Sequence, residues 1–96
     1  MLVLICYDVN TQDRAGRRRL RRIAKACEGY GNRVQYSIFE CQVDATHWAE
    51  LQGRLLAIVD RATDSIRFYF LGEGGFARCE HHGIKPSFDL EGPLVL

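Results

Sequence analysis

The chain has 96 residues, of which 47% are hydrophobic and 26% are charged, and this composition fits one soluble globular domain, residues 1–96, rather than two. Its first apolar run stops after about seven residues and has no basic lead-in, which is too short for a signal peptide or a membrane span. The four cysteines form no C-x-x-C motif. We therefore expect a cytoplasmic protein, not bound to a membrane, with reduced and buried thiols.

The predicted elements begin with a continuous apolar run at residues 2–9, typical of a strand that is covered on both faces near the middle of a sheet. A polar loop follows at residues 10–12. The spacing i, i+3, i+4, i+7 then predicts an amphipathic helix that ends at Gly29, with an apolar stripe formed by Leu20, Ile23, Ala24 and Cys27.

Residues 33–43 are rich in β-formers, and alternation along this segment places Val34 and Ile38 on one face and Arg33 and Phe39 on the other. Asp44 is the predicted N-cap of a second helix, whose apolar stripe contains Trp48, Leu51, Leu55, Ile58, Val59 and Ala62.

Three further strands are predicted at residues 65–71, 78–84 and 94–96. The order is β-α-β-β-α-β with an extra short C-terminal strand. This is the ferredoxin-like α+β arrangement, an antiparallel sheet with two helices on one face. A chain this short buries a modest core, and because oligomerisation is a common remedy we expect an oligomer.

Asp8 is the first candidate for chemistry, since it ends the predicted central strand beside the basic helix. An aspartate that follows a strand also commonly hydrogen-bonds local backbone in a turn. One carboxylate is too few for a good Mg²⁺ site, because magnesium prefers six oxygen ligands. A metal role for Asp8 therefore implies two copies of the chain facing each other across a two-fold axis.

The second candidate is a run of like charge, because no acidic residue stands among the basic residues between Arg14 and Lys25. Residues 1–36 hold eight Lys or Arg and three acidic residues, whereas residues 37–96 hold five Lys or Arg and nine acidic residues. A solvated helix face normally alternates charge, so this run predicts a bound polyanion. The residues expected to bind nucleic acid are Arg14, Arg17, Arg18, Arg21, Arg22 and Lys25.

Three aromatic side chains, Tyr7, Tyr36 and Phe39, are candidates for stacking on bases, although ordinary packing explains most of them equally well. The segment Cys79-Glu80-His81-His82 contains metal-ligand residue types, but no second half of a four-ligand site accompanies it. We interpret it as solvent-exposed. No nucleophile with a partnered base is evident, and His47 is expected in the first turn of the second helix.

Three parts of the chain together resemble the small CRISPR-associated proteins of the Cas2 family. They are Tyr7-Asp8-Val9, the basic helix, and the segment Arg33-Val34-Gln35-Tyr36-Ser37-Ile38-Phe39-Glu40-Cys41. The likeness covers the whole chain in order and length. It implies a ferredoxin-like homodimer in which Asp8 lies near the dimer axis and binds one Mg²⁺ shared by two subunits, and in which residues 93–96 pair with the partner subunit's sheet.

The resemblance also implicates further residues in catalysis. Arg33 and Phe39 align without gaps, whereas Arg18 can stand in for Arg17 or Arg19 because the loop before the helix varies in length. The full implied catalytic set is Asp8, Tyr7, Arg17, Arg19, Arg33 and Phe39.

Two functions in adaptive antiviral defence are compatible with this resemblance, and both stay open. One is a Mg²⁺-dependent endonuclease acting on single-stranded RNA, in which Arg17, Arg19 and Arg33 position the phosphate and Phe39 holds a base. The other is a non-catalytic subunit of spacer acquisition that grips duplex DNA and bridges dimers of the CRISPR integrase subunit, Cas1. A more remote alternative is a ferredoxin-like regulatory or small-ligand module, because a fold does not determine a function.

Overall fold

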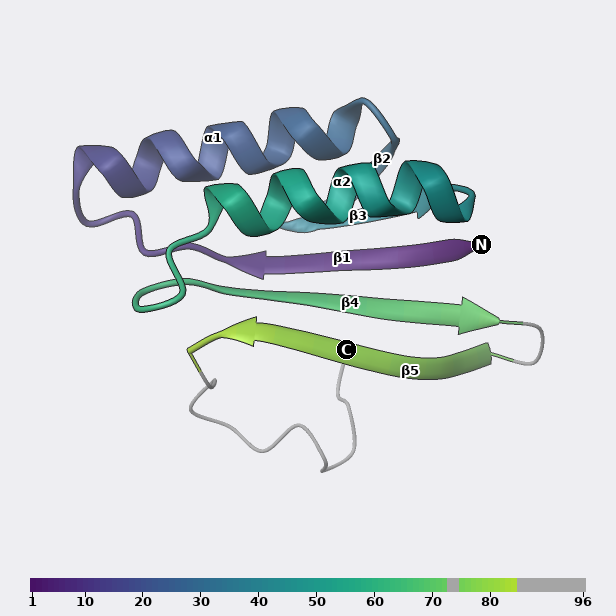
Figure 1. Ribbon diagram of the computed structural model, residues 1–96. Coiled ribbons are helices and arrows are strands. Elements are labelled where there is room, and N and C mark those ends of the chain that lie inside the picture. The colour runs from purple at the N-terminus through teal and green to yellow at the C-terminus, as the bar shows by residue number, and fades with distance from the viewer. Residues whose placement is uncertain (73–74, 85–96) are drawn as a thin grey trace.

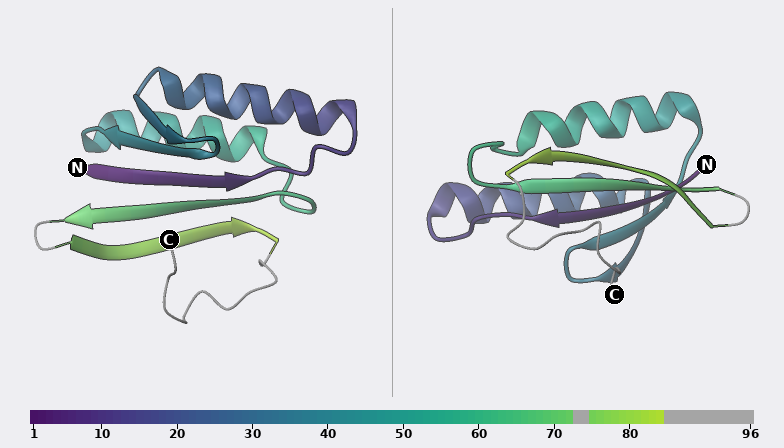
Figure 2. Two further views of the ribbon diagram at one scale, coloured as in Figure 1. Left: turned by 180° about the vertical axis from the view of Figure 1, so that it is seen from behind. Right: turned by 90° about the horizontal axis from the view of Figure 1, so that it is seen from below.

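Two helices pack against one face of a five-stranded antiparallel sheet (Figures 1 and 2) in the computed structural model, which describes residues 1–72 and 75–84, and only the backbone at residues 75–77. The elements in chain order are β1 (Leu2–Asp8), α1 (Arg14–Glu28), β2 (Gly31–Gln35), β3 (Ile38–Gln42), α2 (Ala45–Ile58), β4 (Ser65–Gly72) and β5 (Gly75–Gly83).

The strands lie in the order β2-β3-β1-β4-β5, and every neighbouring pair is antiparallel. The predicted ferredoxin-like order of elements is therefore confirmed. The C-terminal strand predicted at residues 93–96 lies outside the described residues.

Strand β1 is central, as its composition predicts, but among the described elements the helices cover only one of its faces. Val3, Ile5 and Tyr7 alternate toward the helices and are buried. Leu2, Leu4 and Cys6 lie on the opposite face, which we call the open face, and are half-buried. The apolar run is continuous although helices cover only one face. On the open face its cross-strand neighbours are mixed and comprise Ile38, Tyr69 and Leu71 together with Glu40, Gln42 and Arg67.

The core between the helices and the sheet is built from side chains with almost no exposed surface. Its largest members with no exposed surface are Phe39, Phe68, Ile5, Ile23, Leu51 and Leu55. Trp48 of α2 meets Phe68 and Phe70 edge-on, with ring centroids 4.8 and 5.4 Å apart. Each such side chain contributes about 1.5–3 kcal/mol when it is fully buried.

The segment 33–43 is a hairpin, so the unbroken alternation predicted along it was wrong, whereas the shared face predicted for Arg33 and Phe39 is confirmed. Strands β2 and β3 are joined by a turn at Tyr36 and Ser37, so the alternation restarts after the turn. In the resulting register Phe39 lies opposite Arg33 on β2 and Ile5 on β1. Phe39 therefore faces the helices and has no exposed surface.

Both helices begin at an aspartate whose side chain satisfies a free backbone N–H of the first turn. Asp13 accepts from the Gly16 N–H at 2.7 Å, and Asp44 accepts from the His47 N–H at 2.7 Å. The predicted cap at Asp44 is confirmed, and so is the position of His47 in the first turn of α2.

All four cysteines are free, as predicted, but they are not all buried. Cys27 and Cys41 are buried, Cys6 is half-buried and Cys79 is exposed. Burial raises the pKa of the Cys41 thiol to about 11, so this thiol stays protonated and unreactive at neutral pH.

Gly16 provides a test of how tightly the loop after β1 packs on α1. A Cβ at this position would collide with the carbonyl group of Asn10. We expect Gly16→Ala to lower the free energy of unfolding by roughly 1–3 kcal/mol, measured by chemical denaturation. The matched control is Gly53→Ala on α2, where a Cβ meets nothing within 4 Å and a gain of about 0.5–1 kcal/mol is expected. Equal gains in both variants would show that the Asn10 carbonyl packs loosely on α1.

Candidate nucleic-acid interface

A groove of about 460 Å³ lies at the C-terminal end of β1, between α1 and the β2–β3 turn. Asp8 and Thr11 line it where the chain leaves β1, Arg21 lines it from α1, Arg33 from β2 and Tyr36 from the turn. The same end of the sheet receives the start of α1, the end of α2 and the start of β4 (Figure 1). Two connecting segments, the one between β1 and α1 and the one between α2 and β4, therefore meet at this end of the sheet.

Asp8 is the only carboxylate among the described residues that line this groove. It pairs with Ser65 on the neighbouring strand β4, and it is exposed. No hydrogen bond or ion pair links its side chain to another residue of the described part of the chain. The interpretation as a turn aspartate that binds local backbone therefore does not describe it, and its oxygens are available to a ligand.

Arg33 is held beside the groove by aromatic rings of the core. Its guanidinium carbon lies 5.1 Å from the centroid of the Phe39 ring, in a cation–π contact. A second contact, 4.0 Å to Glu28, joins two side chains that are largely exposed and adds little. Arg33 is 45% exposed, so its guanidinium is oriented by Phe39 and still open to an anion.

Tyr7 lines the groove and Phe39 packs behind it, but both rings are buried and neither is free. The two rings stack with centroids 6.3 Å apart. The Tyr7 hydroxyl donates to the Tyr36 carbonyl at 3.3 Å, and the Tyr7 N–H donates to the Ser37 carbonyl at 3.1 Å. Burial raises the pKa of Tyr7, and the nearby Arg33 opposes that rise. The prediction that Phe39 holds a base was wrong, because its ring is fully covered.

Arg19 was predicted to position a phosphate, and its contacts contradict that role. Its Nε donates to Asp64 Oδ2 at 2.8 Å, and its Nη2 donates to Asp64 Oδ1 and Thr63 Oγ1, each at 3.3 Å. The Arg19 side chain is only 17% exposed, and that of Asp64 is 0% exposed. This guanidinium is therefore committed to a buried carboxylate.

Asp64 joins the loop after Asp8 to the loop before β4. Besides Arg19, it accepts from the N–H groups of Asn10 at 3.0 Å and Asp60 at 2.9 Å, and from the Thr63 hydroxyl at 3.1 Å. Burial by itself would raise the pKa of Asp64, but these hydrogen bonds outweigh burial and hold the pKa below its ordinary value of 3.8.

Sequence reasoning missed Asp64, whose partner Arg19 is 45 residues away. The one signal that pointed to such a partner was the excess of basic over acidic residues in the first third of the chain. A buried arginine in that segment has to find its carboxylate elsewhere, since buried charges are paired.

The remaining basic residues of α1 form an outward surface that we call the α1 cationic face, defined as Arg14, Arg17, Arg18, Arg21, Arg22 and Lys25. All six are exposed. Arg17 donates from Nη1 to the Thr11 carbonyl at 3.2 Å, and the other five form no hydrogen bond or ion pair within the described residues. The predicted grouping on one helix is confirmed, and its positive charge is not neutralised by neighbouring side chains.

This positive surface continues onto the second helix. A shallow hollow of about 310 Å³ between α1 and α2 is lined by Arg22 and Lys25 from α1 and by Arg54 from α2. Like charges this close repel, and a bound polyanion would relieve the repulsion.

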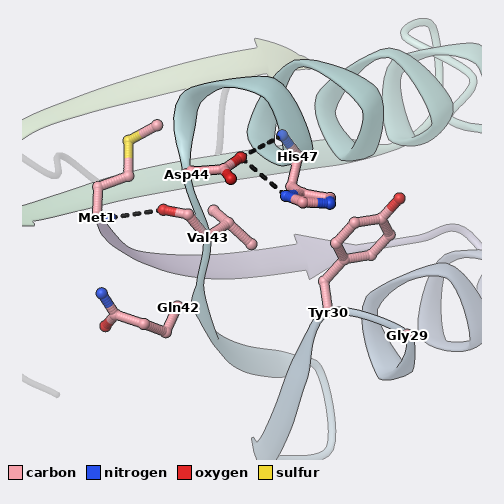
Figure 3. Close-up of a pocket in the computed structure, with 7 residues that line it drawn as sticks. All are labelled: Met1, Gly29, Tyr30, Gln42, Val43, Asp44 and His47. Carbon is pink, nitrogen blue, oxygen red and sulfur yellow. Dashed lines mark hydrogen bonds and ion pairs between the residues drawn. The ribbon is translucent and has the colours of Figure 1, made fainter.

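A second groove, of about 510 Å³, lies at the opposite end of β1 (Figure 3). Here Asp44 Oδ1 accepts from the His47 backbone and lies 2.8 Å from His47 Nδ1, while the Met1 amino group donates to the Val43 carbonyl. Within the part of the chain that the structure describes, no arginine or lysine lines this groove. Its charged groups are used in capping α2 and anchoring the N-terminus, so it is the weaker candidate for binding a phosphate.

The segment Cys79–His82 does not converge on a metal. Alternation along β5 turns Cys79 and His81 to one face and His82 to the other, as their partners Tyr69, Arg67 and Ile66 on β4 show. Within residues 1–72 and 75–84, no group of three or more His, Cys, Asp or Glu is placed to hold a metal ion.

No helix in the described part of the chain is both long enough and apolar enough to cross a membrane.

Comparison with known proteins identifies the relatives of this chain. Residues 1–79 match the profile of the family described as CRISPR associated protein Cas2. A CRISPR-associated endoribonuclease Cas2 of Nitratidesulfovibrio vulgaris is 58% identical over 100% of this chain and 94% of the relative. A CRISPR-associated endonuclease Cas2 of Halalkalibacterium halodurans is 52% identical over 99% of each chain.

Solved structures show the same fold. A crystal structure of Streptococcus pyogenes Cas2 at pH 6.5 matches with a TM-score of 0.71 and 55% identity, over 76% of this chain and 88% of that one. A hypothetical protein of Thermus thermophilus matches with a TM-score of 0.64 and 31% identity, over 74% of this chain and 80% of that one. The ferredoxin-like α+β class is thereby confirmed.

The Arg19–Asp64 pair gives a prediction about stability. Asp64→Asn leaves a mostly buried guanidinium without its carboxylate, and we expect a loss of roughly 3 kcal/mol in the free energy of unfolding. Since the pKa of Asp64 is lowered in the fold, its contribution is complete above its unfolded pKa of about 3.8 and disappears as the pH falls below that value. The difference in the free energy of unfolding between wild type and variant is therefore largest at about pH 7 and becomes smaller in acid. Chemical denaturation at several pH values measures it.

The control for this series is Glu50→Gln, which changes an exposed carboxylate on α2 and is expected to shift stability by less than about 0.5 kcal/mol. A gap for Asp64→Asn that stays constant down to acidic pH would contradict the assignment.

Proposed function

The chain belongs to the CRISPR-associated protein Cas2 family, and from that premise we propose that it serves spacer acquisition as a homodimer that holds duplex DNA by its phosphates. The observation that carries this proposal is the α1 cationic face, with five basic side chains free of any partner among the described residues. Arginine binds phosphate oxygens through a planar fork of donors and stays charged at any working pH. In this role the protein bridges dimers of the Cas1 integrase subunit and strengthens their binding to the DNA.

The proposed homodimer forms through the open face of the sheet. This face carries the half-buried apolar side chains of Leu2, Leu4 and Ile38, with no described helix over them. Asp8 has the same parity along β1 as Leu2 and Leu4 and therefore points to the same side. Packing two open faces together would bring the two Asp8 carboxylates toward each other while both α1 cationic faces stay outside.

A second function, cleavage of single-stranded RNA, is supported by the free carboxylate of Asp8 in a groove that Arg21 and Arg33 also line. Relatives of this chain carry the name endoribonuclease or endonuclease. The donor set fits Mg²⁺, because magnesium in enzymes is commonly held by one or two carboxylates together with substrate phosphates and waters. Asp8 of both subunits would hold the ion, and when bound it supplies a Lewis acid that polarises a phosphate oxygen.

The residues of the groove then have separate roles toward a phosphodiester. Arg33, oriented by the Phe39 ring, and Arg21 bind the non-bridging oxygens and stabilise charge that builds up on the phosphorus centre. Tyr7 holds the turn that closes the groove, through its hydrogen bond to the Tyr36 carbonyl. Arg17 is tied to Thr11 beside the groove and adds positive charge at its rim. Arg19 acts only through Asp64, by fixing the loop that follows Asp8.

A regulatory module that binds a small apolar metabolite is the least supported function. The groove beside Asp8 is lined by exposed arginines and a carboxylate, whereas small-molecule sites are mostly apolar with few polar groups.

The duplex-binding proposal predicts the effect of neutralising α1. Changing Arg18, Arg21 and Arg22 together to Gln should abolish binding of duplex DNA at physiological salt. The slope of log K against log salt should become shallower by about 0.9 for each phosphate that the variant no longer neutralises, measured by fluorescence anisotropy. Stability should stay constant or rise slightly, since repulsion between residues four apart is removed. Arg61→Gln, an exposed arginine outside α1, is the control and should bind as wild type.

The nuclease proposal predicts a different phenotype for Asp8→Asn. Mg²⁺-dependent cleavage of single-stranded RNA should fall by about 100-fold or more, whereas duplex binding and melting temperature should match wild type because Asp8 makes no described side-chain contact. Cleavage is followed on a labelled RNA with and without Mg²⁺, with Glu50→Gln as control. Undiminished cleavage by the variant would assign the activity to another site. If the protein sediments only as a monomer, a metal site shared by two subunits is ruled out.

A further inference from the structure

Tyr36 is by far the most exposed large hydrophobic residue in the described part of the chain. It is 94% exposed, whereas Met1, Val34 and Ile84 reach only 46–48%. Its backbone, by contrast, is held in place, because its carbonyl accepts from the buried Tyr7 hydroxyl at 3.3 Å and the next residue, Ser37, accepts from the Tyr7 N–H at 3.1 Å. The phenol ring is thus presented to solvent from a fixed point of attachment.

The turn that carries this exposed ring borders a charged groove. Tyr36 lines the same groove of about 460 Å³ as Arg21, Arg33 and Asp8. The volume falls within the range of roughly 300–1,000 Å³ that small-ligand sites occupy. The groove therefore combines one open aromatic face with two guanidinium groups, which are the elements that bind an unpaired nucleotide through its base and its phosphate.

We propose that Tyr36, and not Phe39, is the residue on which this protein stacks a base, and that the groove is a subsite for one unpaired nucleotide of a single strand. The base lies on the phenol ring and the adjoining phosphate lies between Arg21 and Arg33. Phe39, which has no exposed surface, acts indirectly by orienting Arg33 from below. This inference rests on the proposed binding of nucleic acid and adds a single-strand site that overlaps the α1 cationic face only at Arg21.

A second copy of this chain is the competing occupant of Tyr36, and the position of the groove argues against it. The groove has one wall formed by Leu20, Arg21 and Ala24 of α1, on the helix-covered side of the sheet, and meets the open face only at Asp8. Dimerisation through the open face would therefore leave the α1 wall of the groove uncovered. Two positively charged guanidinium groups beside the ring would also repel the same groove of another copy.

The test compares the affinity for two oligonucleotides of equal length in the absence of Mg²⁺. One is single-stranded DNA that carries one 2-aminopurine, and the other is made of abasic sugar phosphates. Tyr36→Ala should weaken binding of the first oligonucleotide by about 5- to 100-fold, the expected contribution of one stacked base, and should leave binding of the abasic chain unchanged. Wild type and Tyr36→Phe should both quench 2-aminopurine fluorescence, since stacking needs the ring and not the hydroxyl.

The matched control is Val34→Ala, an exposed apolar side chain of the same hairpin that does not line the groove. It should bind both oligonucleotides as wild type does. Equal affinity of wild type and Tyr36→Ala for the 2-aminopurine strand would overturn the inference. Conversion of a wild-type dimer to a monomer by Tyr36→Ala, seen in sedimentation velocity, would also overturn it by assigning the ring to a second copy.

The outcome for duplex DNA separates this inference from the function on which it rests. Wild type and Tyr36→Ala should bind a blunt duplex equally, because paired bases are already stacked on each other. If wild type binds neither duplex nor single strand, the proposed function fails and the subsite fails with it. If wild type binds both and Tyr36→Ala binds both equally well, the subsite alone is rejected.

Discussion

The ion pair between Arg19 and Asp64 is the interaction on which the geometry of the nucleic-acid site depends. Placing a carboxylate in the interior costs several kcal/mol of hydration, and here a guanidinium, two backbone N–H groups and a hydroxyl replace the lost water. One of those donors is the N–H of Asn10, two residues beyond Asp8. The end of β1, the start of α1 and the start of β4 are thus fastened to one buried carboxylate, and Asp8 is presented from a rigid edge.

The basic residues of the first third of the chain differ in function because they differ in environment. Arg19 is paired inside the fold, Arg33 rests on the Phe39 ring and reaches solvent at its tip, and the α1 cationic face is exposed. Under the proposed function, a substitution of each would act for a separate reason. Loss of Arg19 would disturb the loop after Asp8, loss of Arg33 would remove a guanidinium oriented beside the groove, and loss of Arg21 or Arg22 would lower the positive charge of the α1 cationic face.

The parts of the fold that sequence predicts well are those set by local periodicity and capping. The stripe of α1, the alternation of β4 and the Asp44 cap all follow from neighbours a few residues apart. The hairpin turn escaped prediction because Tyr36 and Ser37 include no Gly, Pro, Asn or Asp to mark it. Alternation counted through that turn therefore did not reveal that the Phe39 ring is fully covered while Tyr36 is 94% exposed. The Arg19–Asp64 pair escaped because it joins segments that only the tertiary fold brings together.

The two proposed activities use different surfaces and can be lost independently. In the proposed function duplex DNA would meet the α1 cationic face along a helix of 15 residues, about 22 Å long at 1.5 Å per residue. The proposed subsite for a single nucleotide is the groove beside Asp8 at one end of that helix. At physiological ionic strength charges more than about 8 Å apart are largely screened from each other in solvent, so the two surfaces share mainly Arg21, which belongs to both. Arg21 is therefore the residue through which occupation of one surface most directly alters the affinity of the other.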